Sequence, residues 1–295
     1  MKVINYSKLI ASLTKTFLNQ NDYLFDKHIP EFMKDGVFLG DYFNQIAVEP
    51  RGDMSPRFYH TFSPFDVISN KAPQHAVVFE DGKLILDIDF DMYVALRTAA
   101  MSVVLLKAMG FESLENKKVL LFGSGRIAKQ SVKILASELG VKTVDVITKS
   151  KDISGIKADV DDVLIKSGSI DEIAQYDIII CHTKTTSSVI SKEQLESIKK
   201  GAVLLSFISS TEHGELPDEV YDISKANVVT DWRQTILGAK DLNRALDSNL
   251  LNEEDLIYIK DLLSGSKIDK EKQYTVYRST GTPIQNLAVL KLLVP

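Results

Sequence analysis

A glycine-rich segment near the middle of the chain has the residue types that bind a pyrophosphate. The apolar run 119–122 leads directly into a G-x-G-x-x-A loop, and a helix-type pattern with apolar residues on one face continues to Leu139. In this arrangement the first glycine permits a tight turn, the second lets the backbone approach the pyrophosphate, and the helix N-terminus supplies unpaired N–H groups. The residues predicted to bind a dinucleotide are Gly123, Ser124, Gly125, Arg126 and Ile127.

The residues after the next predicted strand indicate which dinucleotide is bound. Sites that select NAD place an acid at the end of that strand, where it binds the ribose hydroxyls. Here Asp145 lies in the middle of the strand, and the strand end reads Thr148-Lys149-Ser150. Hydroxyls and a lysine suit a 2′-phosphate, so NADPH is predicted in preference to NADH. The alternative is that Lys149 is a solvated loop residue and that Asp152 binds the ribose.

The elements that would position this loop alternate along the middle of the chain. From residue 117 to residue 231, apolar runs are separated by helix-type patterns. Such continuous apolar runs are typical of a parallel sheet that is covered on both faces. Residues 234–264 are predicted to be mainly helical.

The two ends of the chain have a different pattern. The sequence predicts a helix over residues 9–17, short elements broken by glycine and proline, a hairpin at Asp81-Gly82 and a helix over about 91–109. Residues 273–279 alternate between polar and apolar types, so we expect them to join the sheet of the N-terminal region. The predicted fold is α/β, with a Rossmann domain (113–264) inserted in a discontinuous α+β domain (1–112 plus 265–295).

The overall composition argues against several function classes. The chain has 35 Lys and Arg against 40 Asp and Glu, for a net charge of −5, and no basic run that would indicate a nucleic-acid partner. The most apolar stretch, 98–109, is shorter than the roughly 20 residues that span a membrane, and the N-terminus lacks a secretory pattern. A single cysteine, Cys181, argues against a disulfide framework and a cysteine-rich metal site. We therefore expect a cytoplasmic protein without a bound metal.

Two further motifs resemble those of the ornithine cyclodeaminase/mu-crystallin family. Residues 96–102 (LRTAAMS) are similar to the family's L-R-T-A-A-x-S helix, and residues 277–286 are similar to its F-x-S-x-G-x-A-x-x-D tail. The glycine loop lies between them at the family's distance. The resemblance extends from about Val48 to the C-terminus. It implies a substrate and dimerisation domain around a Rossmann domain, and a homodimer.

The resemblance also implies roles for individual residues. Arg97 and Thr98 look like the family's pair at the substrate carboxylate and the cofactor phosphates, and Arg51 is similar to a second arginine for the carboxylate. Two guanidiniums can orient a carboxylate through charge-assisted bonds. The alternative for Arg51 is an exposed loop arginine.

Further residues are implied at the cofactor. Thr183 resembles the family's threonine near the nicotinamide ribose, although it could be a simple helix cap. Ile208 is also implied as a cofactor contact. Ser279 and Thr280 match tail residues that close over the nicotinamide and the substrate.

The chain departs from the family pattern at two positions. Counting back from Glu215-Leu216, the catalytic aspartate of ornithine cyclodeaminases falls on Ser209, where mu-crystallin-like ketimine reductases also have a serine. A serine without a partner is not a general base, which argues against cyclodeamination. The family's lysine near the substrate is missing from residues 57–64. His60 could replace it as acid or base, or be a strand residue without a chemical role.

These observations favour an NAD(P)H-dependent oxidoreductase. It would reduce a C=N bond next to a carboxylate, in a cyclic ketimine or an imino acid, or catalyse the reverse amino-acid dehydrogenation, with Ser209 or His60 assisting protonation. One alternative is an ornithine cyclodeaminase-like ammonia lyase that uses NAD catalytically. Another is a non-catalytic NADPH-binding protein.

Overall fold

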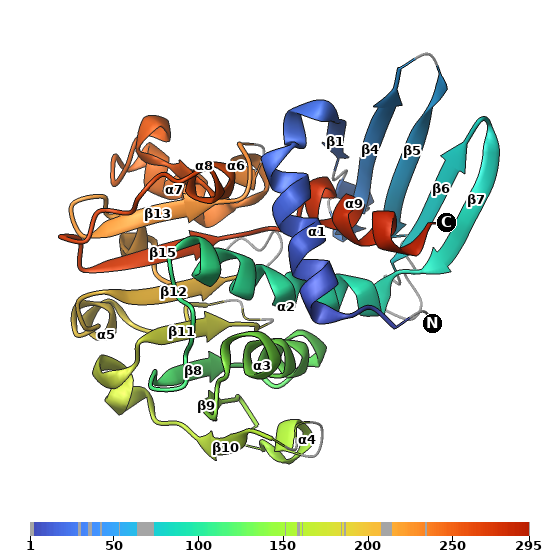
Figure 1. Ribbon diagram of the computed structural model, residues 1–295. Coiled ribbons are helices and arrows are strands. Elements are labelled where there is room, and N and C mark those ends of the chain that lie inside the picture. The colour runs from blue at the N-terminus through green and yellow to red at the C-terminus, as the bar shows by residue number, and fades with distance from the viewer. Residues whose placement is uncertain are drawn as a thin grey trace. The chain divides into compact units, whose positions relative to one another are not determined.

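The computed structural model describes residues 3–28, 31–34, 37–41, 43–52, 54–63, 74–150, 152–157, 160, 162–183, 185, 187–207, 214–233 and 235–294. The chain divides into two compact units: unit 1 joins Met1–Thr98 to Thr282–Pro295, and unit 2 is the continuous segment Ala99–Gly281. Unit 1 contains an antiparallel sheet and unit 2 a parallel sheet (Figure 1). The predicted α/β fold class is therefore confirmed.

Unit 1 is built on a sheet of five antiparallel strands within the described residues, in the order β1-β4-β5-β6-β7. The hairpin predicted at Asp81-Gly82 joins β6 to β7, and both turn residues have positive φ values (50° and 70°), as a type I′ turn requires. A separate pair, β2 and β3, completes the strands of this unit. The bounds are β1 Leu24–His28, β2 Glu31–Lys34, β3 Val37–Asp41, β4 Phe43–Arg51, β5 Met54–Ser63, β6 His75–Glu80 and β7 Lys83–Asp89.

The prediction of short elements in this region is wrong for β4 and β5, which have 9 and 10 residues. Pro56, one of the prolines that suggested interruptions, is the third residue of β5 and lies close to the turn at Gly52 that joins these two strands. Proline is tolerated near strand ends because fewer ladder hydrogen bonds depend on its missing N–H group.

Among its described residues, unit 1 has three α-helices and the short 3-10 helix η1 (Gln20–Asp22). The helix α1 (Tyr6–Leu18) begins where the side chain of Asn5 accepts a hydrogen bond from the Lys8 N–H, and it buries the predicted apolar face, Leu9, Ile10, Leu13 and Phe17. The helix α9 (Pro283–Leu293) is almost entirely buried, its polar residues Gln285 and Asn286 included, and Ser12 of α1 donates to its Ala288 carbonyl at 2.7 Å. The helix α2 (Asp91–Ala108) contains the boundary between the units at Thr98.

Unit 2 holds a sheet in which the described residues form eight strands with parallel pairing throughout, in the order β10-β9-β8-β11-β12-β15-β13-β14 (Figure 1). The strands are β8 Val119–Phe122, β9 Thr143–Ile147, β10 Leu164–Ser167, β11 Ile178–Cys181, β12 Ala202–Ser206, β13 Ala226–Thr230, β14 Ile257–Tyr258 and β15 Tyr274–Arg278. The helices between them are α3 Arg126–Leu139, α4 Ser154–Lys157, η2 Ile170–Gln175, α5 Lys192–Glu196, η3 Asp218–Tyr221, α6 Thr235–Gly238, α7 Lys240–Asp247, η4 Glu253–Asp255 and α8 Ile259–Leu263. In the part of the chain that the structure describes, no helix combines the length and the apolar character needed to cross a bilayer.

The strand β15 corrects the prediction that the tail strand joins the N-terminal sheet. It lies between β12 and β13 of unit 2, and all five of its residues are buried. Its polar residues are buried with partners, since Thr275 accepts from the Asn227 amide at 3.4 Å and Arg278 pairs with Asp241. The alternating pattern therefore reflects satisfied buried polar groups and not a solvent-exposed face.

Candidate functional site

The glycine loop connects β8 to α3. Its two glycines, Gly123 and Gly125, differ in what a larger residue would meet there. Gly123 has φ +105°, and a Cβ atom there would lie 2.2 Å from the His182 carbonyl oxygen, so the protein itself requires a glycine. Gly125 caps α3 with φ −75° and ψ −174°, a conformation open to any residue, and a Cβ there would meet nothing within 4 Å. The space beside Gly125 is therefore left open by the sequence, as the approach of a pyrophosphate requires.

The loop lies at the point where the strand order of the sheet reverses. From β8 the chain adds β9 and β10 on one side, and β11 then pairs with the opposite edge of β8. In open parallel sheets, ligands bind outside the carboxyl ends of the strands at this switch point. Gly123 follows β8 and His182 follows β11, so the two loops that meet there are the glycine loop and the loop that carries Thr183.

The loop after β9 carries the residues predicted to select the cofactor. Lys149 is exposed, and the hydroxyl oxygens of Thr148 and Ser150 lie 3.3 Å apart. Asp145 accepts a hydrogen bond from the Tyr176 hydroxyl at 2.9 Å, which occupies it within the sheet. Asp152 accepts from the Ser154 N–H at 2.9 Å and so caps α4.

His182 joins the switch point to the helix of the glycine loop. Its Nε2 lies 2.7 Å from the hydroxyl of Ser131 on α3, and its ring packs against Phe207 with centroids 4.9 Å apart. Its Nδ1 is buried and has no hydrogen-bond partner among the residues that the structure describes. Burial lowers the pKa of His182 to about 3, so the imidazole is neutral at physiological pH.

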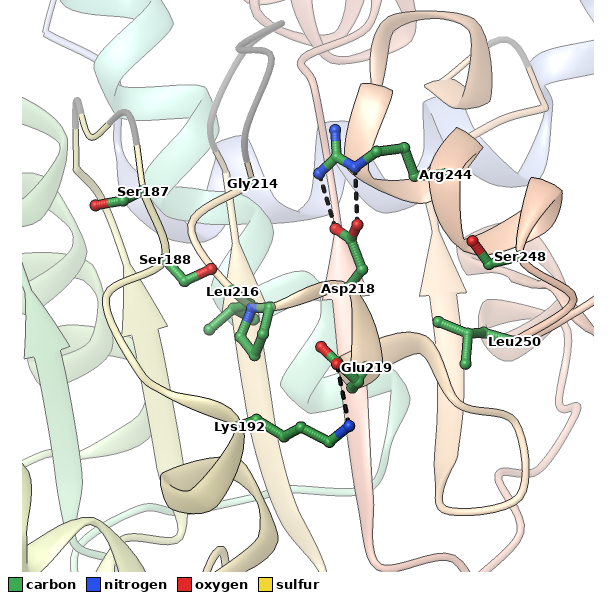
Figure 2. A pocket seen from close by; sticks show the side chains of 11 residues that line it. Ser187, Ser188, Lys192, Gly214, Leu216, Asp218, Glu219, Arg244, Ser248 and Leu250 are labelled. Carbon is green, nitrogen blue, oxygen red and sulfur yellow. Dashed lines mark hydrogen bonds and ion pairs between the residues drawn. The ribbon is translucent and has the colours of Figure 1, made fainter.

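A pocket of about 840 Å³ opens elsewhere in unit 2 (Figure 2). Two ion pairs line it: Arg244 with Asp218, and Lys192 with Glu219, with shortest N–O distances of 2.7 and 3.2 Å. Among the described residues that line this pocket, none is a predicted site residue. Because each cation faces a carboxylate, the ion pairs leave little net charge to attract an anionic cofactor.

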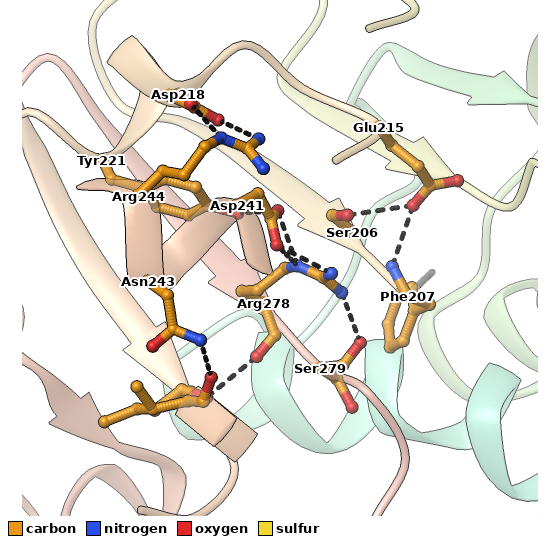
Figure 3. A network of polar contacts seen from close by, with 12 residues as sticks. Ser206, Phe207, Glu215, Asp218, Tyr221, Asp241, Asn243, Arg244, Arg278 and Ser279 are labelled. Atoms are coloured by element: carbon orange, nitrogen blue, oxygen red, sulfur yellow. Dashed lines mark hydrogen bonds and ion pairs between the residues drawn. The ribbon is translucent and has the colours of Figure 1, made fainter. Parts of the chain in front are cut away.

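A buried carboxylate, Glu215, links the loop after β11 to the end of β12, and Figure 3 shows its contacts with Ser206 and Phe207. Glu215 has no exposed surface, and its Oε1 accepts from both the N–H and the hydroxyl of Thr183, at 2.6 and 2.8 Å. Its Oε2 accepts from the Ser206 hydroxyl at 2.9 Å and the Phe207 N–H at 3.1 Å. Burial raises the pKa of Glu215, while these hydrogen bonds and the charge of Arg278 oppose that rise.

The carboxyl end of β15 carries a buried ion pair (Figure 3). Arg278 is fully buried and binds both carboxylate oxygens of Asp241, with its Nε 2.9 Å from Oδ2 and its Nη2 3.0 Å from Oδ1. The Tyr221 hydroxyl donates to the same carboxylate at 2.7 Å. Burial by itself would raise the pKa of Asp241, but the guanidinium and these hydrogen bonds outweigh it and hold the pKa below its ordinary value.

The tail residues predicted to close over the nicotinamide follow this strand. The Ser279 hydroxyl and the Tyr277 hydroxyl both donate to Asp231, the residue after β13. Ser279 and Thr280 are both buried. These contacts fix the backbone at the carboxyl ends of β13 and β15.

Arg97 belongs to unit 1, where it is the centre of a buried polar network. It donates from Nη1 to Thr98 at 2.7 Å and to Gln285 at 2.6 Å, and from Nε to Asn286 at 3.1 Å. The Asn286 amide nitrogen donates in turn to Gln45 at 2.7 Å and to Thr61 at 2.9 Å. Asn286 stands where the family tail pattern has an aspartate.

Arg51 does not converge with Arg97 in this arrangement. Its guanidinium pairs with Glu80, which also accepts from Arg57 at 2.6 Å. Gln45 and Arg51 are six positions apart along β4, which is about 20 Å of extended chain. Arg51 and the Arg97 network therefore lie toward opposite ends of the sheet of unit 1.

His60 and the Arg97 network lie on opposite faces of that sheet. Successive side chains of a strand point to opposite faces, and Thr61, the next residue of β5, contacts Asn286. The Nε2 of His60 lies 2.6 Å from the side-chain oxygen of Asn44, and its ring packs against Phe62. Burial lowers the pKa of His60 from its ordinary value.

Ile208 and Ser209 lie outside the described residues. The sequence analysis did not assign site roles to Glu215, Asp231, Asp241, Gln45 or Gln285. For Glu215 a signal existed, because Glu215-Leu216 resembles the family's E-L pair. The side-chain amides of Gln45 and Gln285 join the Arg97 network only because the helix α9 packs on the sheet of unit 1. The sequence therefore carried no signal for them.

The family profile decides the relationship. The profile of the ornithine cyclodeaminase/mu-crystallin family matches residues 73–294. This chain belongs to that family. No curated protein sequence matches it significantly.

Solved structures share the fold of this ornithine cyclodeaminase/mu-crystallin family member. A probable ornithine cyclodeaminase from Bordetella pertussis Tohama I has a TM-score of 0.80 and 20% identity, covering 97% of this chain and 91% of its own. An archaeal alanine dehydrogenase dimer with bound NAD has a TM-score of 0.78 and 18% identity, covering 98% and 91%. The Thermococcus litoralis Δ1-pyrroline-2-carboxylate reductase, in complex with NADH and L-proline, has a TM-score of 0.77 and 16% identity, covering 99% and 93%.

Proposed function

We propose that this chain is an NAD(P)H-dependent oxidoreductase that reduces a C=N bond next to a carboxylate, in a cyclic ketimine or an imino acid, or catalyses the reverse dehydrogenation. The observation that carries the cofactor part is the glycine loop at the switch point. Gly125 leaves open space in a conformation that any residue could adopt, and α3 starts there without a side-chain cap. A bound pyrophosphate explains both features.

The residues that would hold the cofactor come from three loops of unit 2. The glycine loop, Gly123 to Ile127, would bind the pyrophosphate, and Thr183 would bind the nicotinamide-side ribose. Thr148, Lys149 and Ser150 would bind the 2′-phosphate of NADPH. Ser279 and Ile208 are the further cofactor residues that the family resemblance implies. The bound reduced nicotinamide would supply the hydride.

The substrate class follows from what the relatives' names have in common. Ornithine, alanine and Δ1-pyrroline-2-carboxylate each carry nitrogen on the carbon next to a carboxylate. In this chain Arg97 would bind that carboxylate, because a buried guanidinium offers a planar set of donors that matches it. Thr98 and Thr280 would complete the cofactor and substrate contacts. Reduction adds a hydride to the imine carbon and a proton to its nitrogen.

Two candidates for the proton donor come from the sequence. Ser209 occupies the position of the cyclodeaminase aspartate, and its hydroxyl would relay a proton rather than act as a base. His60 receives less support, because it lies on the sheet face opposite Arg97's network. Replacing Ser209 by alanine and, separately, His60 by asparagine tests the two assignments through the pH profile of kcat.

A homodimer through unit 1 completes the proposal. Four apolar residues form a row across the sheet face opposite α9, where Leu24 pairs with Val48, Val48 with Phe58, and Phe58 with Phe79. Leu24, Phe58 and Phe79 are 67%, 43% and 38% exposed. A second copy of the chain would cover this row, as the family resemblance implies.

The function is tested by binding followed by turnover. Calorimetric titration of the native protein with NADPH and NADH measures whether a dinucleotide binds. Reduced cofactor is then mixed with a panel of cyclic imines, and with keto acids plus amines. Binding with turnover supports a reductase, whereas binding without turnover across the panel supports the non-catalytic alternative.

A further inference from the structure

Glu215 is hydrogen-bonded both to the loop after β11, which carries Thr183, and to the carboxyl end of β12. Its side chain accepts the four hydrogen bonds from Thr183, Ser206 and Phe207 described above, of which Figure 3 shows those from Ser206 and Phe207. Its own carbonyl accepts from the Val189 N–H at 2.8 Å, farther along the loop that carries Thr183. One residue therefore fixes the start and the end of this loop.

The direction of the hydrogen bond between Thr183 and Glu215 follows from the donors around the carboxylate. The N–H groups of Thr183 and Phe207 can only donate, one to each Glu215 oxygen. The Thr183 hydroxyl donates its single hydrogen to Oε1, and an ionised carboxylate there is an acceptor only. The lone pairs of the Thr183 oxygen remain for a ligand.

Thr183 stands directly beside the glycine loop. A Cβ placed on Gly123 would lie 3.7 Å from the Thr183 methyl group, and the Thr183 residue is only partly buried. The hydroxyl is therefore at the edge of the sheet where the proposed dinucleotide site lies. Ser206, by contrast, is fully buried within β12.

We infer that Glu215 is a positioning residue that makes the Thr183 hydroxyl a hydrogen-bond acceptor for a ribose hydroxyl of the nicotinamide cofactor. This inference rests on the proposed function, since it needs a bound dinucleotide. A ribose hydroxyl is a donor that matches this acceptor. A glutamine at position 215 has one acceptor oxygen for the N–H donors of Thr183 and Phe207, so one N–H would face its NH2 group and the contacts that orient the Thr183 hydroxyl would be lost.

The test measures dissociation constants by calorimetry, without turnover. The ligands are NADPH and ADP, since ADP has the adenosine and the pyrophosphate but lacks the nicotinamide-side ribose. The variants are Thr183→Val, Thr183→Ser, Glu215→Gln, Glu215→Asp and the double variant Thr183→Val/Glu215→Gln. Ser206→Ala is the matched control, because it removes a different hydrogen bond to the same carboxylate.

Thr183→Val and Glu215→Gln are each expected to raise the dissociation constant of NADPH about fivefold. This change corresponds to the loss of one hydrogen bond of about 1 kcal/mol. The double variant is no weaker than the single variants, because Glu215 acts through Thr183. Thr183→Ser and Ser206→Ala stay within twofold of the native protein, and ADP binds all variants equally.

Three results would overturn the inference. They are losses that multiply in the double variant, a loss of ADP binding that parallels the loss of NADPH binding, and a Ser206→Ala effect as large as that of Glu215→Gln. If Glu215→Gln does not fold, as thermal unfolding without ligand would show, Glu215→Asp provides the same comparison with the charge retained. A native protein that binds neither NADPH nor ADP instead contradicts the proposed function itself.

Discussion

Arg97 donates a hydrogen bond from Nε to Oδ1 of Asn286 across 3.1 Å, which joins two segments that are 189 positions apart in the sequence. The Asn286 amide then contacts Gln45 and Thr61, so the guanidinium is held by a chain of buried amide and hydroxyl groups. Such support fixes the orientation of the guanidinium before a ligand arrives.

Loss of the planar guanidinium tests the role of Arg97. Arg97→Lys is expected to raise the substrate KM or lower kcat by an amount equivalent to roughly 1.5–3 kcal/mol, because an ammonium cannot reproduce the two-donor fork. Steady-state kinetics at saturating cofactor measure the change. Arg51→Ala compares the second arginine: an equal loss supports a shared carboxylate, and no loss agrees with the separation of Arg51 from Arg97. An Arg97→Lys enzyme with native kinetics contradicts the assignment.

Cofactor selection is expected to depend on Lys149. Lys149→Ala should weaken the binding of NADPH severalfold, which is equivalent to about 1 kcal/mol for an exposed charge contact. The binding of NADH should be nearly unchanged. Calorimetric titration of both cofactors measures this difference. Lys142→Ala is the control, since Lys142 is exposed at the other end of β9. Equal affinity of the native protein for NADPH and NADH would remove the basis of the prediction.

The apolar row on the sheet of unit 1 predicts the oligomeric state. The native protein should be a dimer at micromolar concentration, and Phe58→Asp should make it a monomer, because a charge would then be buried against the second copy. Light scattering after size exclusion measures the mass. Leu164→Asp alters an apolar residue on β10 that is even more exposed than Phe58, and it should leave the dimer intact. A native monomer would contradict this prediction.

The buried pair of Arg278 and Asp241 predicts a large loss of stability. Asp241→Asn should lower the free energy of unfolding by about 3–5 kcal/mol, because it leaves a guanidinium charge uncompensated in the interior. Urea denaturation measures the change. Glu271→Gln is the control, since it breaks the ion pair of Glu271 (85% exposed) with Lys200 (60% exposed). It should lower the free energy of unfolding by less than about 0.5 kcal/mol. Similar losses in the two variants would contradict the expected effect of burial.

The sequence was sufficient to predict an element where the local residue pattern and the tertiary structure agree. The run from β8 through the glycine loop to α3 was predictable because strand, glycines and amphipathic helix are adjacent in the chain. The Asp81-Gly82 hairpin was predictable for the same reason, since both residues favour the positive φ values that the turn requires.

The sequence was insufficient where a polar residue is buried with a distant partner. The alternation of residues 273–279 suggested a strand of the N-terminal sheet, whereas Arg278 is buried by its pairing with Asp241, which lies 37 positions away on α7. His60 suggested catalysis, yet which face of β5 carries the Arg97 network depends on Asn286 from the far end of the chain. Neither contact leaves a periodic signal, so neither could be inferred from spacing alone.

The most direct test of the central claim follows the absorbance of reduced nicotinamide while the product is quantified. With NADPH and a cyclic imine that carries a carboxylate next to the C=N bond, the account predicts that one cofactor is oxidised for each cyclic amino acid formed. Release of ammonia from a diamino acid with no net change in the absorbance would contradict it, because that result identifies a lyase that returns the hydride to the product.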